Sequence, residues 1–356
     1  TLYQERARFV SPYAVQVGSL CLRARAFILA TGSTVSHVPI PGLEEAGYLT
    51  SDEALELRQA PQSMIVLGGG PVALELAQFF SRIGVDVTLL QRSAHVLSNM
   101  DEDLARPVEV RLSREGMRIY THTHLQRVTH TGTEKVVHFL HDGREKTVSA
   151  QVIFKALGRR PNIDGLNLEA AKVEVRDDRV LVDETMRTSQ PHIFAVGDVN
   201  GLHEVVHLAI QQGEIAGWNA THPDCPPRRY SDRLKAQVVF TEPQVASVGL
   251  SEKECQARAI PYLVASYPFC DHGKALCLGE TDGHVKLLCD PKTGQVLGAH
   301  IVGPEASELI HELIAVMYFH GTVADLLQIP HYHPTLAEIV TYPAEALLEQ
   351  IHNLTP

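Results

Sequence analysis

The stretch Met64-Ile-Val-Leu-Gly-Gly-Gly-Pro-Val-Ala-Leu-Glu-Leu-Ala-Gln-Phe-Phe80 decides the fold of this chain. An apolar run of strand length meets a glycine cluster and then a helical pattern. Gly68, Gly70 and Ala73 occupy the three positions of the dinucleotide fingerprint G-x-G-x-x-G/A. The first glycine permits the tight turn, the second lets a pyrophosphate approach the backbone, and the small third residue lets helix pack on strand. A second strand predicted at 87–90 completes a βαβ unit that binds a dinucleotide.

The composition is that of an acidic globular protein. The 356 residues are 44% hydrophobic and 21% charged, with a formal net charge of −11. The negative charge argues against nucleic acid as a partner, and the apolar runs are too short to span a membrane. The six cysteines show no zinc-binding spacing. We therefore predict no metal site and a reducing, cytoplasmic setting.

Five motifs occur in an order that resembles one protein family. They are Ala30-Thr-Gly32, Gly68-Gly-Gly-Pro-Val-Ala-Leu-Glu75, Gly158-Arg-Arg-Pro-Asn162, Ala195-Val-Gly-Asp198 and His333-Pro-Thr-Leu-Ala-Glu338. Over essentially its whole length the chain is similar to the class I pyridine nucleotide–disulfide oxidoreductases, which include dihydrolipoamide dehydrogenase, glutathione reductase and mercuric reductase. The resemblance implies a homodimeric, FAD-dependent enzyme. Hydride would pass between NAD(P)H and FAD, and electrons would pass to a dithiol or disulfide substrate.

The resemblance also implies an α/β fold with two Rossmann-like dinucleotide-binding domains, the FAD one incomplete, and a C-terminal α+β dimerisation domain. We expect a first FAD segment at 1–50, the NAD(P) domain at 51–163, a second FAD segment at 164–232 and the dimerisation domain at 233–356. The family's first glycine fingerprint and its C-x-x-x-x-C redox disulfide occur nowhere in these residues. We therefore expect the chain to be a fragment that cannot turn over a disulfide substrate by itself.

The flavin is expected to contact the second half of the FAD domain. Asp198, after the strand that ends at Gly197, resembles the family's ligand of the ribityl hydroxyls. The helix predicted at 206–219 would aim its N-terminus at the flavin pyrimidine, where reduction builds negative charge. The residues predicted to contact the cofactors in this part of the chain, by turns or by N–H groups, are Thr31, Gly32, Gly158, Gly197, Asp198, His207, Leu208 and Ala209.

The choice of nucleotide depends on the end of the second strand, Leu89-Leu-Gln-Arg92. NAD-dependent members place an acid there for the ribose 2′-hydroxyl, whereas arginine accommodates a 2′-phosphate. Gln91 stands at the acid position and Arg92 follows it, although the family's second arginine falls near Ser98. This pattern favours NADP and leaves NAD open. Glu75, on the helix one turn beyond the glycines, matches a family glutamate that pairs with a lysine beside the flavin; a solvated helix glutamate is the alternative.

His333 and Glu338 form the motif with the most direct chemistry. A glutamate that orients an imidazole makes a general base that can cycle a thiol proton near neutral pH. Pro334 is predicted to lie in the first turn of a helix, with His333 just before it and Glu338 inside it. The resemblance implies that this pair reaches across a dimer interface to a disulfide of the other subunit. The alternative is a capping histidine and a surface glutamate.

Several functions remain open at this point. Dihydrolipoamide dehydrogenase-like activity leads, because the chain has the His–Glu pair and lacks the C-terminal vicinal cysteines of mercuric reductase. A mercuric reductase-like enzyme and a soluble transhydrogenase-like flavoprotein are the alternatives within the family. A catalytically inactive, dimerising nucleotide-binding module is the alternative from another class.

Overall fold

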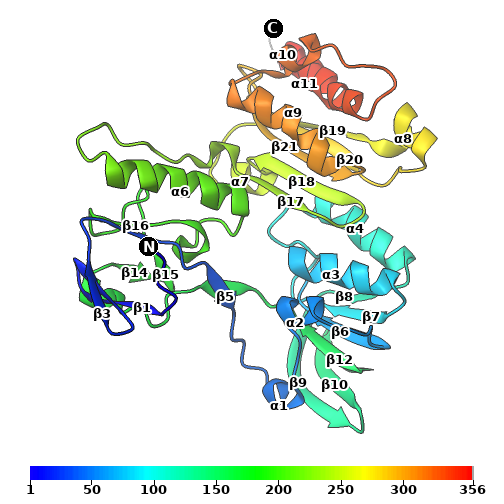
Figure 1. Ribbon diagram of the computed structural model, residues 1–356. Helices are drawn as coiled ribbons and strands as arrows, with labels where there is room; N and C mark the ends of the chain where they lie inside the picture. Colours follow the sequence, from blue (N-terminus) through cyan, green and yellow to red (C-terminus); the bar gives the residue numbers. More distant parts are fainter. Residues whose placement is uncertain (355–356) are drawn as a thin grey trace. The chain divides into compact units, whose positions relative to one another are not determined.

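The computed structural model describes residues 1–354 (Figure 1). The chain divides into two compact units, one made of residues 1–37 and 158–232 and the other of residues 38–157 and 233–356. Residues 38–50 thus fall in the second unit, whereas the sequence assigned them to the first FAD segment; the four-domain division remains a prediction. No helix among residues 1–354 is long and apolar enough to cross a bilayer.

The first unit is organised around a two-stranded parallel sheet. Its strands are β4 (Phe27–Leu29) and β16 (Ile193–Ala195), and Phe27 pairs with Ile193. The helix α6 (Val206–Thr221) packs on both strands. The remaining elements are β1 (Ala7–Ser11), β2 (Ala14–Val17), β3 (Leu20–Arg23), β5 (Ser33–Val35), β13 (Arg159–Pro161), α5 (Leu168–Ala171), β14 (Val175–Arg176), β15 (Arg179–Val180) and the 3-10 turn η1 (Gly197–Asn200).

The nucleotide half of the second unit contains the βαβ unit that the sequence predicted. Four parallel strands have the order β12-β6-β7-β8, and β6 and β7 are almost entirely buried, as expected for a sheet covered on both faces. The elements are α1 (Leu43–Ala46), α2 (Ser51–Leu55), β6 (Ser63–Leu67), α3 (Pro71–Arg82), β7 (Asp86–Leu90), α4 (Glu102–Arg114), β8 (Arg118–Tyr120) and β12 (Val152–Lys155).

An antiparallel sheet with the order β11-β10-β9 follows β8. The hairpin of β10 (Glu134–His141) and β11 (Arg144–Ala150) turns at Asp142 and Gly143, as the sequence predicted, and both turn residues have positive φ. The sequence reading missed β9 (Thr123–Thr131) and the helix α4.

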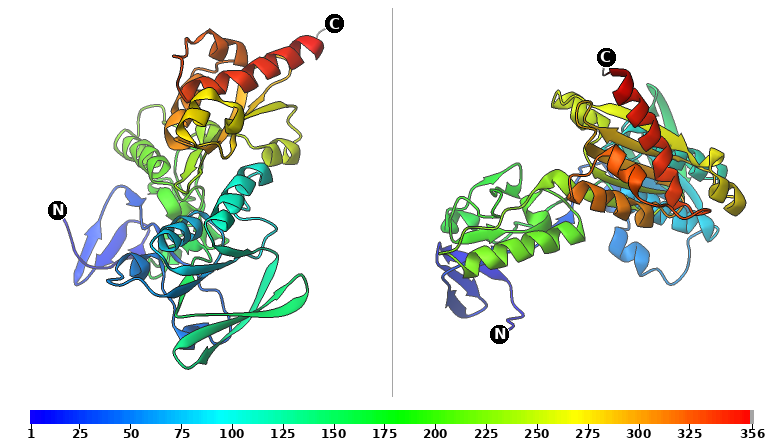
Figure 2. Two further views of the ribbon diagram at one scale, coloured as in Figure 1. Left: turned by 90° about the vertical axis from the view of Figure 1, so that its right-hand side faces the viewer. Right: turned by 90° about the horizontal axis from the view of Figure 1, so that it is seen from above.

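The C-terminal half of the second unit, the predicted dimerisation domain, is a five-stranded antiparallel sheet with the order β17-β18-β21-β20-β19. The helix α9 packs on β18 and β21, and α11 packs on β19 and β20 (Figure 2). The elements are β17 (Ala236–Val239), β18 (Gln244–Gly249), α7 (Glu252–Ala257), β19 (Leu263–Pro268), η3 (Phe269–Asp271), α8 (Gly273–Leu278), β20 (His284–Cys289), β21 (Val296–Gly303), α9 (Ala306–Tyr318), α10 (Val323–Gln328), η4 (Ala337–Val340) and α11 (Thr341–Leu354).

Apolar and ionic contacts join the two halves of the second unit. Val245 and Val302 of the five-stranded sheet belong to the same buried cluster as the apolar faces of α3 and α4. The ammonium of Lys286, which is 2% exposed, lies 2.9 Å from Asp101, 2.8 Å from Asp103 and 3.2 Å from Glu252. Two carboxylates of the nucleotide half therefore share a buried cation of the other half.

The region around Pro334 differs from the prediction. The peptide bond between His333 and Pro334 is cis, and the first helical residue is Ala337, where the 3-10 turn η4 begins. Pro334 therefore does not open a helix; it lies in the loop before the helical turn that starts at Ala337. Glu338 does lie in a helical turn, which continues into α11.

Candidate functional site

The glycine loop after β6 leaves space where a pyrophosphate would lie. Gly68 has φ +112, and a Cβ there would lie 2.2 Å from the Ala156 carbonyl oxygen. Gly70 is the N-cap of α3, and a Cβ there would meet no atom within 4 Å. The buried Ala73 follows in the first turn of α3. The loop is thus closed on the protein side and open beside the helix N-terminus, whose free N–H groups attract anions.

Gln91 and Arg92, which follow β7, differ in their exposure. Gln91 is 9% exposed, and its side chain packs against Gly69, where a Cβ would lie 3.1 Å from its Cδ. Its amide donates a long hydrogen bond, 3.4 Å, to the carbonyl oxygen of His95. Arg92 is exposed. The side chain at the expected acid position is therefore turned inward, while the adjacent guanidinium is free to meet an anion.

Glu75 is half-buried on α3 and is occupied within the second unit. Its Oε1 accepts a 2.8 Å hydrogen bond from the N–H of Phe240. Burial raises the pKa of the Glu75 carboxyl, and the Phe240 N–H opposes that rise. One turn later, the Gln78 side chain accepts from the Glu242 N–H and donates to the Glu242 carbonyl oxygen, both at 2.8 Å. This face of α3 therefore fixes residues 240–242, and Glu75 is not the solvated helix residue of the alternative interpretation.

In the first unit, the motifs at Thr31–Gly32 and Gly158–Asn162 lie against each other. The Thr31 hydroxyl donates to the Asn162 carbonyl oxygen at 2.7 Å, and the Asn162 amide donates back to the Thr31 carbonyl oxygen at 3.1 Å. The Asn162 N–H donates to the carbonyl oxygen of Gly32 at 2.9 Å, and Ser36 N–H donates to that of Gly158 at 3.0 Å. Two turns that are far apart in sequence thus fix one another.

Asp198 is held at the end of a short polar chain. Its Oδ2 accepts a 2.6 Å hydrogen bond from the Ser33 hydroxyl, and that hydroxyl accepts a 2.7 Å bond from Nε of Arg159. Arg159 also donates to the carbonyl oxygen of Ser33 at 3.0 Å. The carboxylate therefore has one fixed oxygen, and the other can accept hydrogen bonds from a ligand.

The turn from β16 into α6 is built for close backbone approach. Gly197 has φ +70, and a Cβ there would lie 3.1 Å from the methyl group of Ala209. The Gly197 N–H donates to the buried side chain of Gln212 at 2.8 Å. The Ala209 N–H already donates to the Val205 carbonyl oxygen at 3.0 Å. The Ala209 N–H thus makes the first helical bond, whereas Leu208, with its buried side chain, keeps a first-turn N–H; the contacts of both residues with the flavin remain predictions.

His333 and Glu338 form a pair in the second unit. Nδ1 of His333 lies 3.1 Å from Oε1 and 3.0 Å from Oε2 of Glu338. The His333 side chain is 80% exposed, whereas that of Glu338 is 13% exposed. A carboxylate at Nδ1 keeps the proton on that nitrogen, which leaves the Nε2 lone pair free. The arrangement is that of an oriented general base that faces outward.

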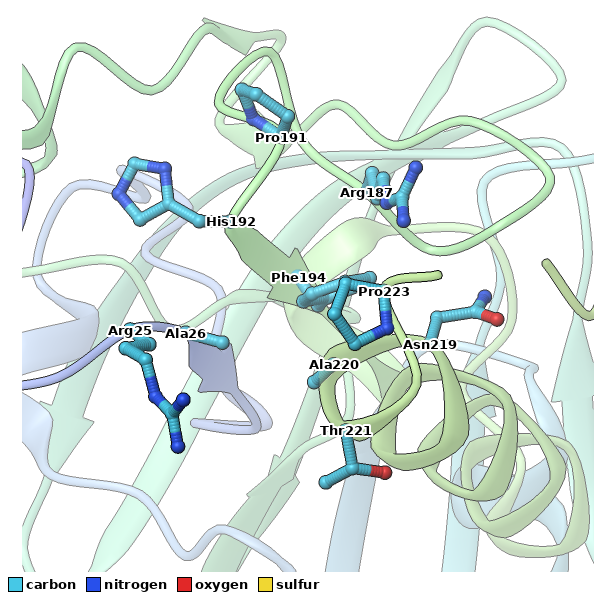
Figure 3. A pocket seen from close by; sticks show the side chains of 10 residues that line it. All are labelled: Arg25, Ala26, Arg187, Pro191, His192, Phe194, Asn219, Ala220, Thr221 and Pro223. Carbon is cyan, nitrogen blue, oxygen red and sulfur yellow. The ribbon is translucent and has the colours of Figure 1, made fainter. Parts of the chain in front are cut away.

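The first unit also has a cavity of about 590 Å3, which contains none of the predicted site residues (Figure 3). Its lining comes from the beginnings of β4 and β16 and from the end of α6 and the residues after it. The Arg187 guanidinium lies over the Phe194 ring, 5.7 Å from its centroid. The cavity lies at the opposite ends of these strands from Thr31 and Asp198, so we do not assign it to the flavin.

The sequence profile of the pyridine nucleotide-disulphide oxidoreductases matches residues 1–213, and that of their dimerisation domain matches residues 235–344. The chain belongs to this family. The resemblance drawn from the five motifs is thereby confirmed, together with the α/β fold and the dimerisation domain.

Curated relatives include two kinds of enzyme. The chain is 32% identical over 326 residues to a mercuric reductase of Staphylococcus aureus and 34% identical over 331 residues to a dihydrolipoyl dehydrogenase of Mycobacterium tuberculosis. These alignments cover 91% and 92% of this chain, but 59% and 69% of the relatives. The chain therefore spans roughly three-fifths to two-thirds of the length of these relatives.

Two solved structures have the same fold as this chain. LpdA from Mycobacterium tuberculosis matches 96% of this chain with a TM-score of 0.85 and 28% identity, and the match covers 75% of LpdA. The HOCl-induced flavoprotein disulfide reductase RclA from Escherichia coli matches 96% of the chain with a TM-score of 0.85 and 24% identity, over 78% of its own length. The second likeness concerns the fold alone.

Three residues of these sites had no role in the sequence analysis. Ser33 and Arg159 orient Asp198, and they stand within or beside the motifs that were recognised. His272 is fully buried, and its Nε2 lies 3.5 Å from Oε1 of Glu338. No sequence signal indicates its proximity to Glu338, because the two residues lie far apart in the sequence.

Proposed function

We propose that this chain is the larger part of an FAD-dependent NAD(P)H–disulfide oxidoreductase of the dihydrolipoamide dehydrogenase type, active as a homodimer. The observation that carries the proposal is the oriented His333–Glu338 pair, which has a carboxylate at Nδ1 and an exposed ring. A base of this kind takes a proton from a thiol and returns it, as dithiol oxidation and disulfide reduction both require. The match of residues 235–344 to the dimerisation domain supports the homodimer.

FAD would supply the redox chemistry between the nucleotide and the thiol groups. The residues of the first unit suit the flavin half of that cofactor: Asp198 has one free carboxylate oxygen, and Gly197 keeps the backbone open beside α6. Thr31, Gly32 and Gly158 would keep these turns in place. The six cysteines include no C-x-x-x-x-C pair, so the redox disulfide would belong to a segment outside these residues.

NADPH is the nucleotide that we propose for the glycine loop of α3. The open position at Gly70 suits the pyrophosphate, and the exposed Arg92 suits a 2′-phosphate, which arginine binds through charge-assisted hydrogen bonds. The inward-turned Gln91 offers no carboxylate to a ribose 2′-hydroxyl. NADH is the alternative, and a competitive titration of the two nucleotides distinguishes them.

The test compares two histidines that each contact a glutamate. His331 Nε2 lies 2.8 Å from Glu312, and this pair serves as the matched control for His333 and Glu338. In the parent enzyme that carries the redox cysteines, we expect His333→Gln to slow lipoamide reduction about 10²- to 10⁴-fold. NADPH-driven reduction of an artificial dye through the flavin should persist, and His331→Gln should change both rates little.

The possible outcomes separate the proposal from its alternatives. Unchanged lipoamide turnover in the His333→Gln enzyme would show that His333 is not the base. Reduction of Hg(II) without reduction of lipoamide would indicate the mercuric reductase-like function. A protein that binds NADPH, shows no flavin absorption and reduces no dye would be the inactive nucleotide-binding module.

A further inference from the structure

A buried imidazole lies behind the His333–Glu338 pair. His272 is 0% exposed, and its Nε2 lies 3.5 Å from Glu338 Oε1. Neither ring nitrogen has a hydrogen-bond partner among the described residues. A buried polar group without a hydrogen-bond partner is costly, so the nearby Glu338 carboxylate is a candidate acceptor for His272. The distance is a few tenths of an ångström longer than an N–H···O hydrogen bond, which a small rotation of either side chain would close.

His272 lies at a helix start, but its side chain does not cap the helix. It is the N-cap of α8, a position where serine, threonine, aspartate and asparagine are preferred because their side chains bind the first N–H groups. The His272 side chain makes no such bond and is buried instead. Its backbone N–H donates to the Phe269 carbonyl oxygen at 3.1 Å, which fixes the start of the side chain.

Three side chains near His272 bear on its role. Glu338 is the only charged residue of the turn η4. The Tyr342 ring of α11 meets the imidazole edge-on, with 6.2 Å between centroids, and Tyr342 stacks on Tyr267 of β19 at 4.1 Å. His333, on the other side of Glu338, is the second titratable group. Burial lowers the pKa of His272, although the Glu338 charge opposes this and His333 adds to it. One carboxylate therefore faces two imidazoles, one of them buried and the other exposed.

We propose that His272 is a positioning residue for the base: its imidazole donates from Nε2 to Glu338 Oε1 and holds the carboxylate in the plane that His333 Nδ1 requires. His333 then keeps its proton on Nδ1 and presents Nε2 to the thiol. The catalytic relevance of this contact rests on the proposed function, whereas the contact itself does not.

The tautomers of the two histidines test the proposal in this chain without any activity assay. Nitrogen-15 NMR of labelled imidazoles distinguishes the Nδ1–H form from the Nε2–H form, and His272→Asn, His272→Phe and His333→Gln assign the signals. In the unsubstituted chain we expect Nε2–H on His272 and Nδ1–H on His333. In His272→Phe, which keeps a ring but has no donor, we expect His333 to lose Nδ1–H as its major form. His272→Asn, whose amide can donate to Glu338, should restore it.

His203 lies in the first unit, where its Nε2 is 2.8 Å from Asp232. It provides an internal reference whose signal should not change in any variant. The proposal is overturned if His272 carries its proton on Nδ1, or if His333 keeps its tautomer in His272→Phe. Should His272→Phe not fold, the tautomer of His272 in the unsubstituted chain decides. A failure of the proposed function, seen as full lipoamide turnover in the His333→Gln enzyme, would leave these spectra unchanged, so the two failures are distinguishable.

Discussion

Gly70→Ala should separate nucleotide binding from folding. The residue has φ −82 and ψ 179, which any residue adopts, and a Cβ there meets no atom within 4 Å. Alanine reduces the freedom of the unfolded chain, a gain of up to about 1 kcal/mol, and it is a poorer N-cap than glycine, a loss of similar size. The two effects oppose each other, so we expect the free energy of unfolding to change by less than about 1 kcal/mol.

The same methyl group should weaken NADPH binding strongly. It would stand where the pyrophosphate approaches the first turn of α3 and would displace an oxygen from its N–H donors. A hydrogen bond to a charged group contributes about 1.5–3 kcal/mol, so the loss of one raises the dissociation constant roughly 10- to 100-fold. Isothermal titration with NADPH measures the affinity, and thermal denaturation without nucleotide measures the stability.

Gly68→Ala is the matched comparison for Gly70→Ala. Its φ of +112 and a Cβ position only 2.2 Å from the Ala156 carbonyl oxygen predict that this variant loses stability as well as affinity. Wild-type NADPH affinity in a folded Gly70→Ala protein would refute the placement of the pyrophosphate on this loop. A large loss of stability in Gly70→Ala would refute the argument from its open Cβ position.

Three further predictions concern charged side chains. Arg92→Gln should weaken NADPH binding about 10-fold while NADH binding changes less than about twofold, and a titration that shows equal losses for both nucleotides would contradict the role of the guanidinium. Lys286→Met should lower the free energy of unfolding in urea by about 3–5 kcal/mol, because Asp101 keeps a buried charge without its cation; adding Asp101→Asn should recover part of that loss. Burial alone would raise the pKa of Glu115, but hydrogen bonds from arginines lower it to about 2, so its stabilising effect is present above about pH 4.5 and is lost as the pH falls toward 2; Glu115→Gln should flatten the acid limb of the unfolding curve in that window.

Local patterns predicted the nucleotide half well because its signals are short in range. The strand 63–67, the glycine turn and the helix 71–82 lie within twenty residues, and each follows from apolar periodicity and glycine geometry. The helix 102–114 was missed although it is amphipathic, since Pro107 interrupts its pattern. At Pro334 the expectation of a helix start failed, because sequence alone does not distinguish a proline in the first helical turn from one in the loop before it.

The candidate sites were predictable in their residues but not in the residues' partners. Asp198, His333 and Glu338 belong to recognisable motifs. Ser33 reaches Asp198 only because β4 and β16 lie side by side, and the 3.5 Å approach of His272 to Glu338 joins residues that are far apart in the sequence. Such contacts depend on tertiary packing, which no periodicity in one sequence records.

The interleaving of the two compact units has a consequence for how the protein is made. Phe27 pairs with Ile193, so the first unit cannot close until residues 158–232 have left the ribosome. The parallel nucleotide sheet, which needs only residues 63–155, is complete well before then. During synthesis β4 and β5 therefore wait for their partner strands β16 and β13 while an inserted domain folds between them, and this interval is the one in which a chaperone would find these two strands exposed.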